Sequence, residues 1–263
     1  MNLFSGPAFK KANQVLDGVL KEKKRLGEEL VVSHKQPLSD SDLEKLDHYF
    51  SDVLTVPDPR KLSFFVWYTV TTHFCLRGGE LQAKLRKSDL IFSTVDDNEK
   101  IHLATDFMTK NHRGGVDGTS FTTSGCITDD LQVRAIKKYL SVLHPKCDRL
   151  FQRAKTSPGM HLSLYTACWF MCSPLSHNIL SGMMVRLSEA AHLSKAYTNH
   201  CLRVTSVTLT KKAGLEDRKI RVVSGHKCIT SLQAYDRPTS HDSSVAAAAI
   251  DRKPLSCVSV CCL

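Results

Sequence analysis

The sequence predicts a mainly helical protein with a small antiparallel sheet, an α+β class. Apolar side chains recur at helical spacing in several segments that begin with a capping residue, which is the pattern of helices that bury one face. Residues 89–107 instead read as strand, turn and strand, in the stretches "DLIFSTV", "DDNEK" and "IHLATDF". A chain of 263 residues has room for one medium domain with an appendage.

The first 58 residues are expected to form a separate helical segment. Residues 8–30 place Phe, Leu and Val at roughly helical spacing, with the basic run "KEKKR" on the solvent side. That run is compatible with a nuclear localisation signal and with an ordinary solvated helix face. A capping box formed by Ser41 and Glu44 starts a second helix. The stretch "VPDPRK" ends this segment, with Asp58 placed to cap a new helix and Pro59 at that helix's first position.

More helices follow the boundary at residue 58. The apolar stretch "KLSFFVWYTVTTHFCL" leads into "RGGEL", where Gly78 and Gly79 require a tight turn before a short helix. The clearest helix lies in "TDDLQVRAIKKYLSVLHP", with Thr128 as its cap and Pro145 after its end. A further helix is predicted over "SHNILSGMMVRLSEAAHL", whose paired methionines fill the core.

One predicted helix places two phosphate-seeking side chains on a single face. Thr198 or Asn199 caps this helix, and Gly214 supplies the left-handed residue that ends it. His200 and Arg203 are three residues apart, so both project from the same face in the first turn, where backbone N–H groups also point outward. This is a place to hold an anion. The short helix "EDRKIRVV" and the stretches "SGH" and "ITSLQAYDRP" come next.

The charge of the chain favours a polyanionic partner. The net charge is +10, and residues 1–60 hold 9 Lys and Arg against 10 Asp and Glu, which leaves 27 against 16 for residues 61–263. The basic excess therefore lies wholly in the larger part, as expected of a protein that binds nucleic acid. A basic surface kept for solubility is the alternative. No apolar run approaches the ~20 residues that span a bilayer, so no membrane contact is expected.

The ten cysteines are expected to be reduced thiols. The opening "MNLFSGPAFKKAN" lacks the uninterrupted apolar stretch of a signal peptide, which favours a nuclear or cytosolic protein. Cys168 and Cys172 lie near His161 and His177, but no second pair of this kind accompanies them, and "TACWFMC" is typical of buried apolar surface. We therefore expect neither a metal site nor a cofactor.

Four short motifs occur in a fixed order along the chain. They are "LRGGEL" with Arg77, "HCLR" with His200 and Arg203, "SGH" with His226, and "AYDRP" with Tyr235 nine residues after the last histidine. Together they resemble the catalytic signature of tyrosine recombinases, in which His-x-x-Arg is followed by Gly-His and then by the nucleophilic tyrosine. The stretches "YTNHCLR" and "SGHKCITSLQAY" are most similar to the Crypton-type recombinases and their host-derived relatives, which include zinc finger MYM-type proteins. The resemblance covers roughly residues 60–240.

This resemblance implies a phosphate clamp. Arg77 and Arg203 would each grip one DNA phosphate, because a guanidinium offers paired N–H donors to the phosphate oxygens. His200 and His226 would add hydrogen bonds as charge develops on those oxygens. Taken singly, each residue has a plainer interpretation, as a surface arginine or as a capping or turn histidine.

The resemblance also implies a nucleophile and a proton donor. Tyr235 would attack the phosphodiester and form a 3′-phosphotyrosyl link, a step that requires neither ATP nor metal. In the family, a lysine on a β-hairpin turn protonates the leaving 5′-oxygen. Lys110 in "MTKNHRGG" is the best match, and Lys100 in the preceding turn is the second choice. A half-buried aromatic anchor and solvated turn lysines are the plainer interpretations of these residues.

The expected domain plan and partners follow from the family. Residues 1–58 would be a shortened form of the helical DNA-binding region that the family places in front, residues 59–240 the tyrosine-recombinase catalytic domain, and residues 241–263 a tail. The partner is double-stranded DNA, on which the protein would assemble as a synaptic tetramer in the nucleus. Phosphate-backbone contacts are expected from basic residues near the site, several of which are equally compatible with solvated helix faces: Lys211, Lys212, Arg218, Lys219, Arg221 and Lys227.

These observations predict a site-specific DNA recombinase or integrase that cleaves and rejoins strands through Tyr235. The alternative is a catalytically inactive, domesticated recombinase domain that binds DNA or chromatin and serves transcription. A more distant alternative is a helical scaffold for protein partners.

Overall fold

The computed structural model describes residues 9–27, 35–95, 98–104, 125–155, 168–226 and 232. The chain divides into two compact units, residues 1–35 and residues 36–263. In the first unit, α1 (Lys10–Arg25) exposes the apolar side chains of Val15, Leu16, Val19 and Leu20. None of the helices in the described ranges is both long enough and apolar enough to cross a membrane.

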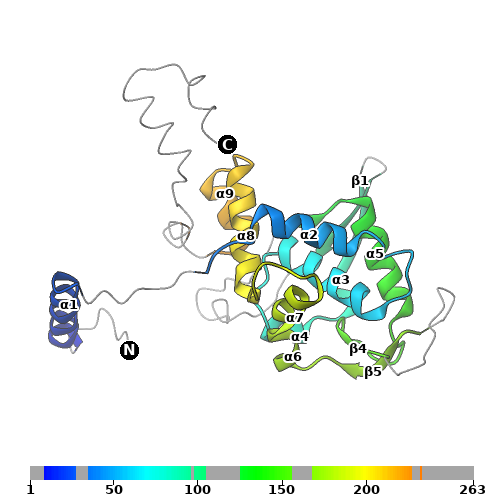
Figure 1. Cartoon of the computed structure of the whole chain (residues 1–263), viewed down its shortest axis with the longest axis horizontal. Helices are drawn as coiled ribbons and strands as arrows, with labels where there is room; N and C mark the ends of the chain where they lie inside the picture. The colour runs from blue at the N-terminus through cyan, green and yellow to red at the C-terminus, as the bar shows by residue number, and fades with distance from the viewer. Residues whose placement is uncertain are drawn as a thin grey trace, which may run out of the picture. The chain divides into compact units, whose positions relative to one another are not determined.

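The second unit is mainly helical with a small antiparallel sheet, as predicted, and it carries a second small antiparallel sheet as well (Figure 1). Its helices are α2 (Asp40–Phe50), α3 (Pro59–His73), α4 (Glu80–Lys84), α5 (Asp130–Val142), α6 (His177–Ser181), α7 (Met183–Ala190), α8 (Asn199–Lys212) and α9 (Asp217–Ser224). Its strands are β1 (Leu90–Val95), β2 (Asn98–Leu103), β3 (Cys126–Ile127), β4 (Gln152–Ala154) and β5 (Phe170–Pro174).

Helix α3 lies at the centre of this unit and contacts both α5 and α8. Val66, Trp67 and Val70 of α3 are completely buried. A helix that is apolar on most of its faces must be covered on most of its faces, which explains why helices from both halves of the unit pack against it. Asp58 caps α3 through hydrogen bonds from the N–H groups of Arg60 and Lys61, and Pro59 takes the first position, as predicted.

Helix α2 belongs to the same compact unit as α3. Leu46 and Phe50 lie in the main hydrophobic cluster, and the Phe50 ring packs edge-on against Phe65 of α3, with ring centroids 5.0 Å apart. The compact unit therefore begins at Gln36, whereas the sequence analysis drew its boundary at residue 58. The proline-rich stretch separates two helices that share one core.

The predicted hairpin is present as β1 and β2, which pair from Leu90 opposite Leu103 to Val95 opposite Asn98. Two further features were not predicted. The short strand β3 extends this sheet, with Ile127 opposite Ile101, and β4 pairs with β5 in a second sheet. Strands of two to five residues give too little alternation for a pattern to be recognised.

Three helix boundaries differ from those predicted. Ser39, not Ser41, caps α2 by accepting a hydrogen bond from the N–H of Asp42. Asp129, not Thr128, caps α5 through the N–H of Gln132. The single helix predicted over residues 176–193 is interrupted at Gly182, which separates α6 from α7. For the two caps, a neighbouring residue could form a comparable local hydrogen bond, and Gly182 is a residue of low helix propensity within the predicted helix.

Candidate phosphate-binding site

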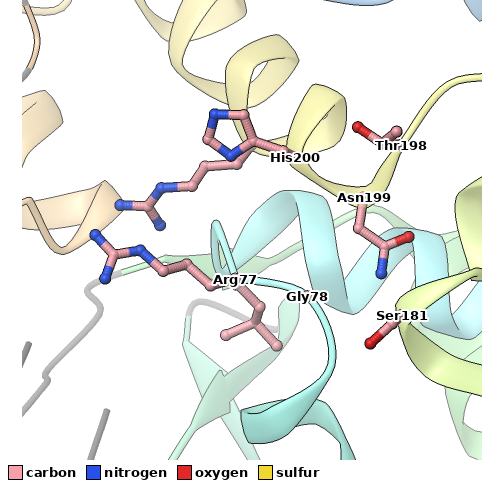
Figure 2. A pocket seen from close by; sticks show the side chains of 8 residues that line it. Arg77, Gly78, Ser181, Thr198, Asn199 and His200 are labelled. Carbon is pink, nitrogen blue, oxygen red and sulfur yellow. The ribbon is translucent and has the colours of Figure 1, made fainter. Parts of the chain in front are cut away.

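A pocket of about 340 Å³ lies where the chain leaving α3 meets the first turn of α8 and the end of α6. Its lining residues are Leu76, Arg77, Gly78, Ser181, Thr198, Asn199, His200 and Arg203. Figure 2 shows Arg77 and His200 reaching the pocket from these two different segments, with Asn199 and Ser181 on its other side. The structure thus brings Arg77 together with His200 and Arg203, which lie more than 120 residues further along the sequence.

The "RGG" turn can approach the neighbouring helices closely because its two glycines have no side chains. A Cβ atom on Gly78 would lie 2.7 Å from Nδ2 and 2.8 Å from Cβ of Asn199, and a Cβ atom on Gly79 would lie 2.6 Å from Oγ of Ser181. Gly79 also has a positive φ of 86°, which favours glycine. These two glycines therefore set the position of Arg77 relative to α6 and α8.

A buried glutamine holds the turn against α3. Oε1 of Gln82 accepts hydrogen bonds from the indole N–H of Trp67 at 3.0 Å and from the N–H of Gly79 at 3.3 Å. Its amide nitrogen donates to Oγ1 of Thr71 at 2.8 Å. Because Gln82 is almost fully buried, these bonds are the ones that satisfy it, and they join the turn to the central helix.

Arg203 is a buried cation at the base of the pocket. Its side chain is only 3% exposed, although it carries a full positive charge. Nη1 donates to the carbonyl oxygen of Cys75, and Nη2 lies 3.2 Å from Nε2 of His226. Cys75 has a φ of 48°, an uncommon left-handed conformation for a residue other than glycine. The guanidinium is thus fixed in orientation from two sides.

The hydrogen bonds around His226 indicate its tautomer. The Ser224 hydroxyl donates to the carbonyl of Ile220 at 2.6 Å, so its oxygen accepts from Nδ1 of His226 at 2.5 Å. Nη2 of Arg203 lies 3.2 Å from Nε2 and 3.4 Å from Nδ1 of His226, so the guanidinium faces the imidazole ring and not one of its nitrogens alone.

Burial and three cations keep His226 neutral. Partial burial and then the positive charges of Arg203, Arg77 and His200 together lower the pKa of His226 to about 4. Each of these charges disfavours the protonated imidazole. The site is a concentration of positive charge around His226.

A buried carboxylate fixes the segment that leads into α8. Asp42 of α2 is completely buried and accepts hydrogen bonds from the N–H of Ser194 at 2.8 Å, the hydroxyl of Tyr197 at 2.7 Å and the hydroxyl of Ser39 at 2.9 Å. Burial alone would raise the pKa of Asp42, but the bonds from Ser194, Tyr197 and Ser39 hold it well below its usual range. Asp42 therefore remains charged and links α2 to the residues just before His200.

Asn199 connects α8 to the two helices before it. Its side chain is buried, Nδ2 donates to the carbonyl of Leu180 at 2.7 Å, and Oδ1 accepts from the N–H of Met184 at 3.0 Å. Asn199 was one of the two residues predicted to cap α8. In the structure Thr198 takes the cap position without a side-chain bond to the helix, and Asn199 is the first helical residue.

The structure leaves several predicted residues untested. Lys110, Tyr235 and Lys227 lie outside the described residues. Lys100 lies within strand β2 opposite Ser93, not in the turn to which it was assigned.

The described basic residues expected to contact DNA differ in how they are held. Lys211 lies 3.3 Å from the carboxylate of Asp217, and Lys212 lies 3.4 Å from Asp40. Arg218 and Lys219 are exposed on α9, and Arg221 is partly buried.

Several residues that shape the pocket were missed by sequence reasoning. Asp42 reads as an ordinary acid in the first turn of a helix, and nothing near it in the sequence points to Ser194 or Tyr197. Ser181 is likewise unremarkable in sequence. Over the described parts of the chain, no three His, Cys, Asp or Glu side chains gather as a metal site would require.

Comparison with known proteins identifies the fold. No protein-family model matches the chain, and no curated protein matches it significantly in sequence. Among solved structures, the XerH site-specific recombinase bound to palindromic difH substrate, a post-cleavage complex, matches with a TM-score of 0.54 at 16% identity, over 82% of this chain and 53% of that chain. The pre-cleavage complex of XerH with difH matches with a TM-score of 0.51 at 16% identity, over 94% and 66%.

A third match is XerA recombinase, with a TM-score of 0.49 at 18% identity, over 96% of this chain and 80% of that chain. The chain thus spans about half to two thirds of the two XerH chains. At this identity the likeness concerns the fold. The second compact unit has the fold of a tyrosine-recombinase catalytic domain, in agreement with the fold class predicted from the sequence.

Proposed function

We propose that this protein is a site-specific DNA recombinase or integrase of the tyrosine type. The observation that carries the proposal is that Arg77, His200 and Arg203 line one pocket of a recombinase-like fold, with His226 beside Arg203. A solvated basic surface would not require a buried arginine that is held from two sides. Nor would it require two glycines that let the turn carrying Arg77 approach α6 and α8. A pocket lined by two guanidiniums is suited to a single phosphate.

The proposed reaction is the exchange of one phosphoester for another. The phenol of Tyr235 gives its proton to water as its oxygen attacks the phosphorus, the bond from phosphorus to the 5′-oxygen breaks, and the leaving oxygen takes a proton, which we assign to Lys110. The 5′-hydroxyl of a partner strand then reverses the step and releases the tyrosine. Arg77 and Arg203 stabilise the charge that spreads over the non-bridging oxygens in both steps.

The two histidines have different surroundings. His200 is exposed at the first turn of α8 and lines the pocket. His226 binds Ser224 through Nδ1, and its ring lies against Nη2 of Arg203. Its donation to phosphate stays a prediction, and the described contacts support a role in holding Arg203.

The finer parts of the proposal rest on sequence resemblance. They are the kinship with Crypton-type recombinases, the nuclear location, the synaptic tetramer, and the reading of residues 1–58 as a shortened DNA-binding region. Double-stranded DNA is the proposed partner, supported by the net charge of +10 and by the exposed Arg218 and Lys219 on α9, close in sequence to His226.

The test looks for a covalent protein–DNA adduct. Purified protein is incubated with a pool of nicked duplexes whose arms carry randomised sequence, so that a cleaved end diffuses away and traps the intermediate. Adducts are isolated by denaturing electrophoresis, and the attached DNA is amplified and sequenced. The matched variants are Tyr235→Phe, which we expect to give no adduct, and Tyr49→Phe, a partly buried tyrosine of α2 that should give the same adduct as the unaltered protein.

Three outcomes are informative. Enrichment of related DNA sequences in an adduct that requires Tyr235 supports the proposal. An adduct that persists in Tyr235→Phe overturns the assignment of the nucleophile. No adduct, together with DNA affinity that falls steeply with salt, overturns the enzyme and supports the alternative of a DNA-binding module.

A further inference from the structure

A second groove, of about 830 Å³, lies beside the candidate phosphate pocket without sharing any lining residue with it. It is formed by the first turns of α3, the β4–β5 hairpin and the helices α6 and α7. Helix α6 contributes to both cavities: Ile179 lines the groove and Ser181 lines the pocket. The recombination chemistry proposed above makes no use of the groove.

The floor of the groove is apolar. Large apolar side chains line it from α3, β5, the residue after β5, α6 and α7, and Met171 of β5 is 46% exposed. The apolar lining residues are Phe64, Met171, Leu175, Ile179 and Met183. Methionine adapts its shape easily, which suits a surface that receives another apolar group.

The charges around the groove all have the same sign. Four of the twelve lining residues are basic and none is acidic. The basic residues are Arg60, Arg153, Lys155 and Arg186, contributed by α3, the β4–β5 hairpin and α7. Arginines beside an apolar floor can place their aliphatic stems on it while the guanidiniums stay at the rim. The groove therefore offers apolar contact at its base and positive charge at its edge.

We propose that this groove binds an acidic amphipathic peptide segment of a partner protein. Leucine or phenylalanine side chains of the segment cover the floor, and its carboxylates pair with the basic rim. This occupant follows from charge complementarity, because the lining residues include four cations and no acid, so acidic side chains are attracted and a basic segment would be repelled. The groove volume lies within the range of about 300–1,000 Å³ typical of ligand pockets.

The apolar floor argues for a peptide over nucleic acid. A phosphodiester backbone matches the rim cations but has no apolar side chains to bury against Met171 and its neighbours. An amphipathic segment satisfies both the floor and the rim, as amphipathic helices do in other apolar grooves. The inference goes beyond the proposed recombinase and does not depend on it.

The test uses the full chain and a designed probe. The probe is a fluorescein-labelled helical peptide of about four turns, with Leu and Phe along one face and Glu along the other. Two matched peptides replace every Glu with Gln, or every Leu and Phe with Ser. Binding is measured by fluorescence anisotropy for the unaltered protein, for the groove variant Arg153→Glu/Arg186→Glu, and for the control variant Arg134→Glu/Lys146→Glu. The control makes the same charge change at exposed positions outside the groove.

We expect saturable binding of the acidic amphipathic peptide and at least about tenfold weaker binding of both matched peptides. The groove variant should lose at least about tenfold in affinity, and the control variant less than about twofold. Thermal unfolding of the two variants is compared first, to show that both are folded. Met171→Ser is a further groove variant that leaves the charge unchanged, and it should also weaken peptide binding.

Three results would overturn the inference. One is equal weakening in the groove and control variants, which would mean that the peptide responds only to net charge. Another is no saturable binding at about 100 µM peptide. The third is loss of duplex DNA binding, without loss of peptide binding, in the groove variant, which would make the groove a nucleic-acid contact. The DNA adduct of the groove variant should equal that of the control, so a failure here is distinct from a failure of the proposed function.

Discussion

The two ends of α8 are built differently. Its first turns are buried in the main core and are tied to their surroundings by Asn199, Arg203 and the Asp42 network. Its last turns pack against α9 over a separate cluster formed by Val207, Ile220 and Leu232. One helix therefore joins a rigid polar site to a less deeply packed basic surface.

This difference suggests a division of labour along α8. A site that stabilises developing charge requires fixed donors, because reorientation during the reaction would cost free energy. Backbone contacts to DNA are made by long side chains that need only lie near a phosphate. Substitutions at the first end should change the chemical step, and substitutions at the second end should change the affinity for DNA.

Arg203 gives the largest expected effect. We expect Arg203→Lys to lower the rate of adduct formation by about 10²- to 10³-fold, because lysine keeps the charge but loses the paired donors that reach Cys75 and the phosphate. The rate is measured by stopping the reaction at intervals and separating the adduct formed on the nicked duplex by denaturing electrophoresis. Arg134→Lys, an exposed arginine of α5, is the control and should leave the rate unchanged. An equal loss in both variants would contradict the assignment.

Arg203 can also be tested without any reaction. Removing its charge in Arg203→Ala should raise the pKa of His226 from about 4 towards the ordinary histidine value of about 6.5, because the guanidinium is the nearest cation that disfavours the charged imidazole. The titration is followed by NMR of the imidazole resonances. An unchanged pKa of His226 would place the two groups further apart than described.

Asp42 gives the next effect, on stability. We expect Asp42→Asn to lower the free energy of unfolding at pH 7 by about 2–3 kcal/mol, because the amide cannot accept all the hydrogen bonds that the buried carboxylate accepts. Urea unfolding measures the change. Asp47→Asn, an exposed acid of the same helix, should change stability by less than about 0.5 kcal/mol.

The pH dependence sharpens this prediction. The folded-state pKa of Asp42 is depressed, so its contribution to stability is present above the unfolded pKa of about 3.9 and is lost as the pH falls below that value. The difference between the unaltered protein and Asp42→Asn should be constant from about pH 5 to 7 and should shrink below about pH 4. A constant difference at low pH would contradict the role of the charge.

Part of the candidate site and of the fold could be predicted from the sequence. His200 and Arg203 were recognisable from their spacing on one helix, and Arg77 from the resemblance to the recombinase signature; the structure places all three on one pocket. Their catalytic roles stay predictions. The α3 helix and its cap were predictable because the Asp58–Pro59 signal and a long apolar run are local properties.

What the sequence could not reveal depends on contacts between distant segments. The bonds from Asp42 to Ser194 and Tyr197 span more than 150 residues, and the close approach of Gly78 to Asn199 is visible only when α3 and α8 are packed together. Each missed feature holds the recognised residues in place.

A smaller effect is expected at two glycines that lie near opposite ends of α8. Comparing them distinguishes a loss of stability from a displacement of Arg77. We expect Gly78→Ala to cost about 1–3 kcal/mol of stability and to slow adduct formation, because its Cβ would meet Asn199 and displace the turn that carries Arg77. Gly214→Ala meets no atom within 4 Å but has a φ of 78°, so it should cost about 1–2 kcal/mol of stability and leave the rate unchanged. Unfolding curves and adduct rates of the two variants are compared. Equal rates would show that the close approach at Gly78 does not position Arg77.

The smallest effect is expected at the far end of α8 and on α9. Lys219 is exposed, whereas Lys211 lies within 3.3 Å of Asp217 and is already engaged by the protein. We therefore expect Lys219→Ala to reduce the slope of log affinity against log salt by about 0.9, the value for one lost phosphate contact, and Lys211→Ala to reduce it by less. Binding of a duplex is measured by anisotropy across a salt series, and the adduct rate at saturating DNA should be the same in both variants. A reduced adduct rate at saturation would mean that the basic end of α8 takes part in the chemical step, and the division of labour along the helix would then fail.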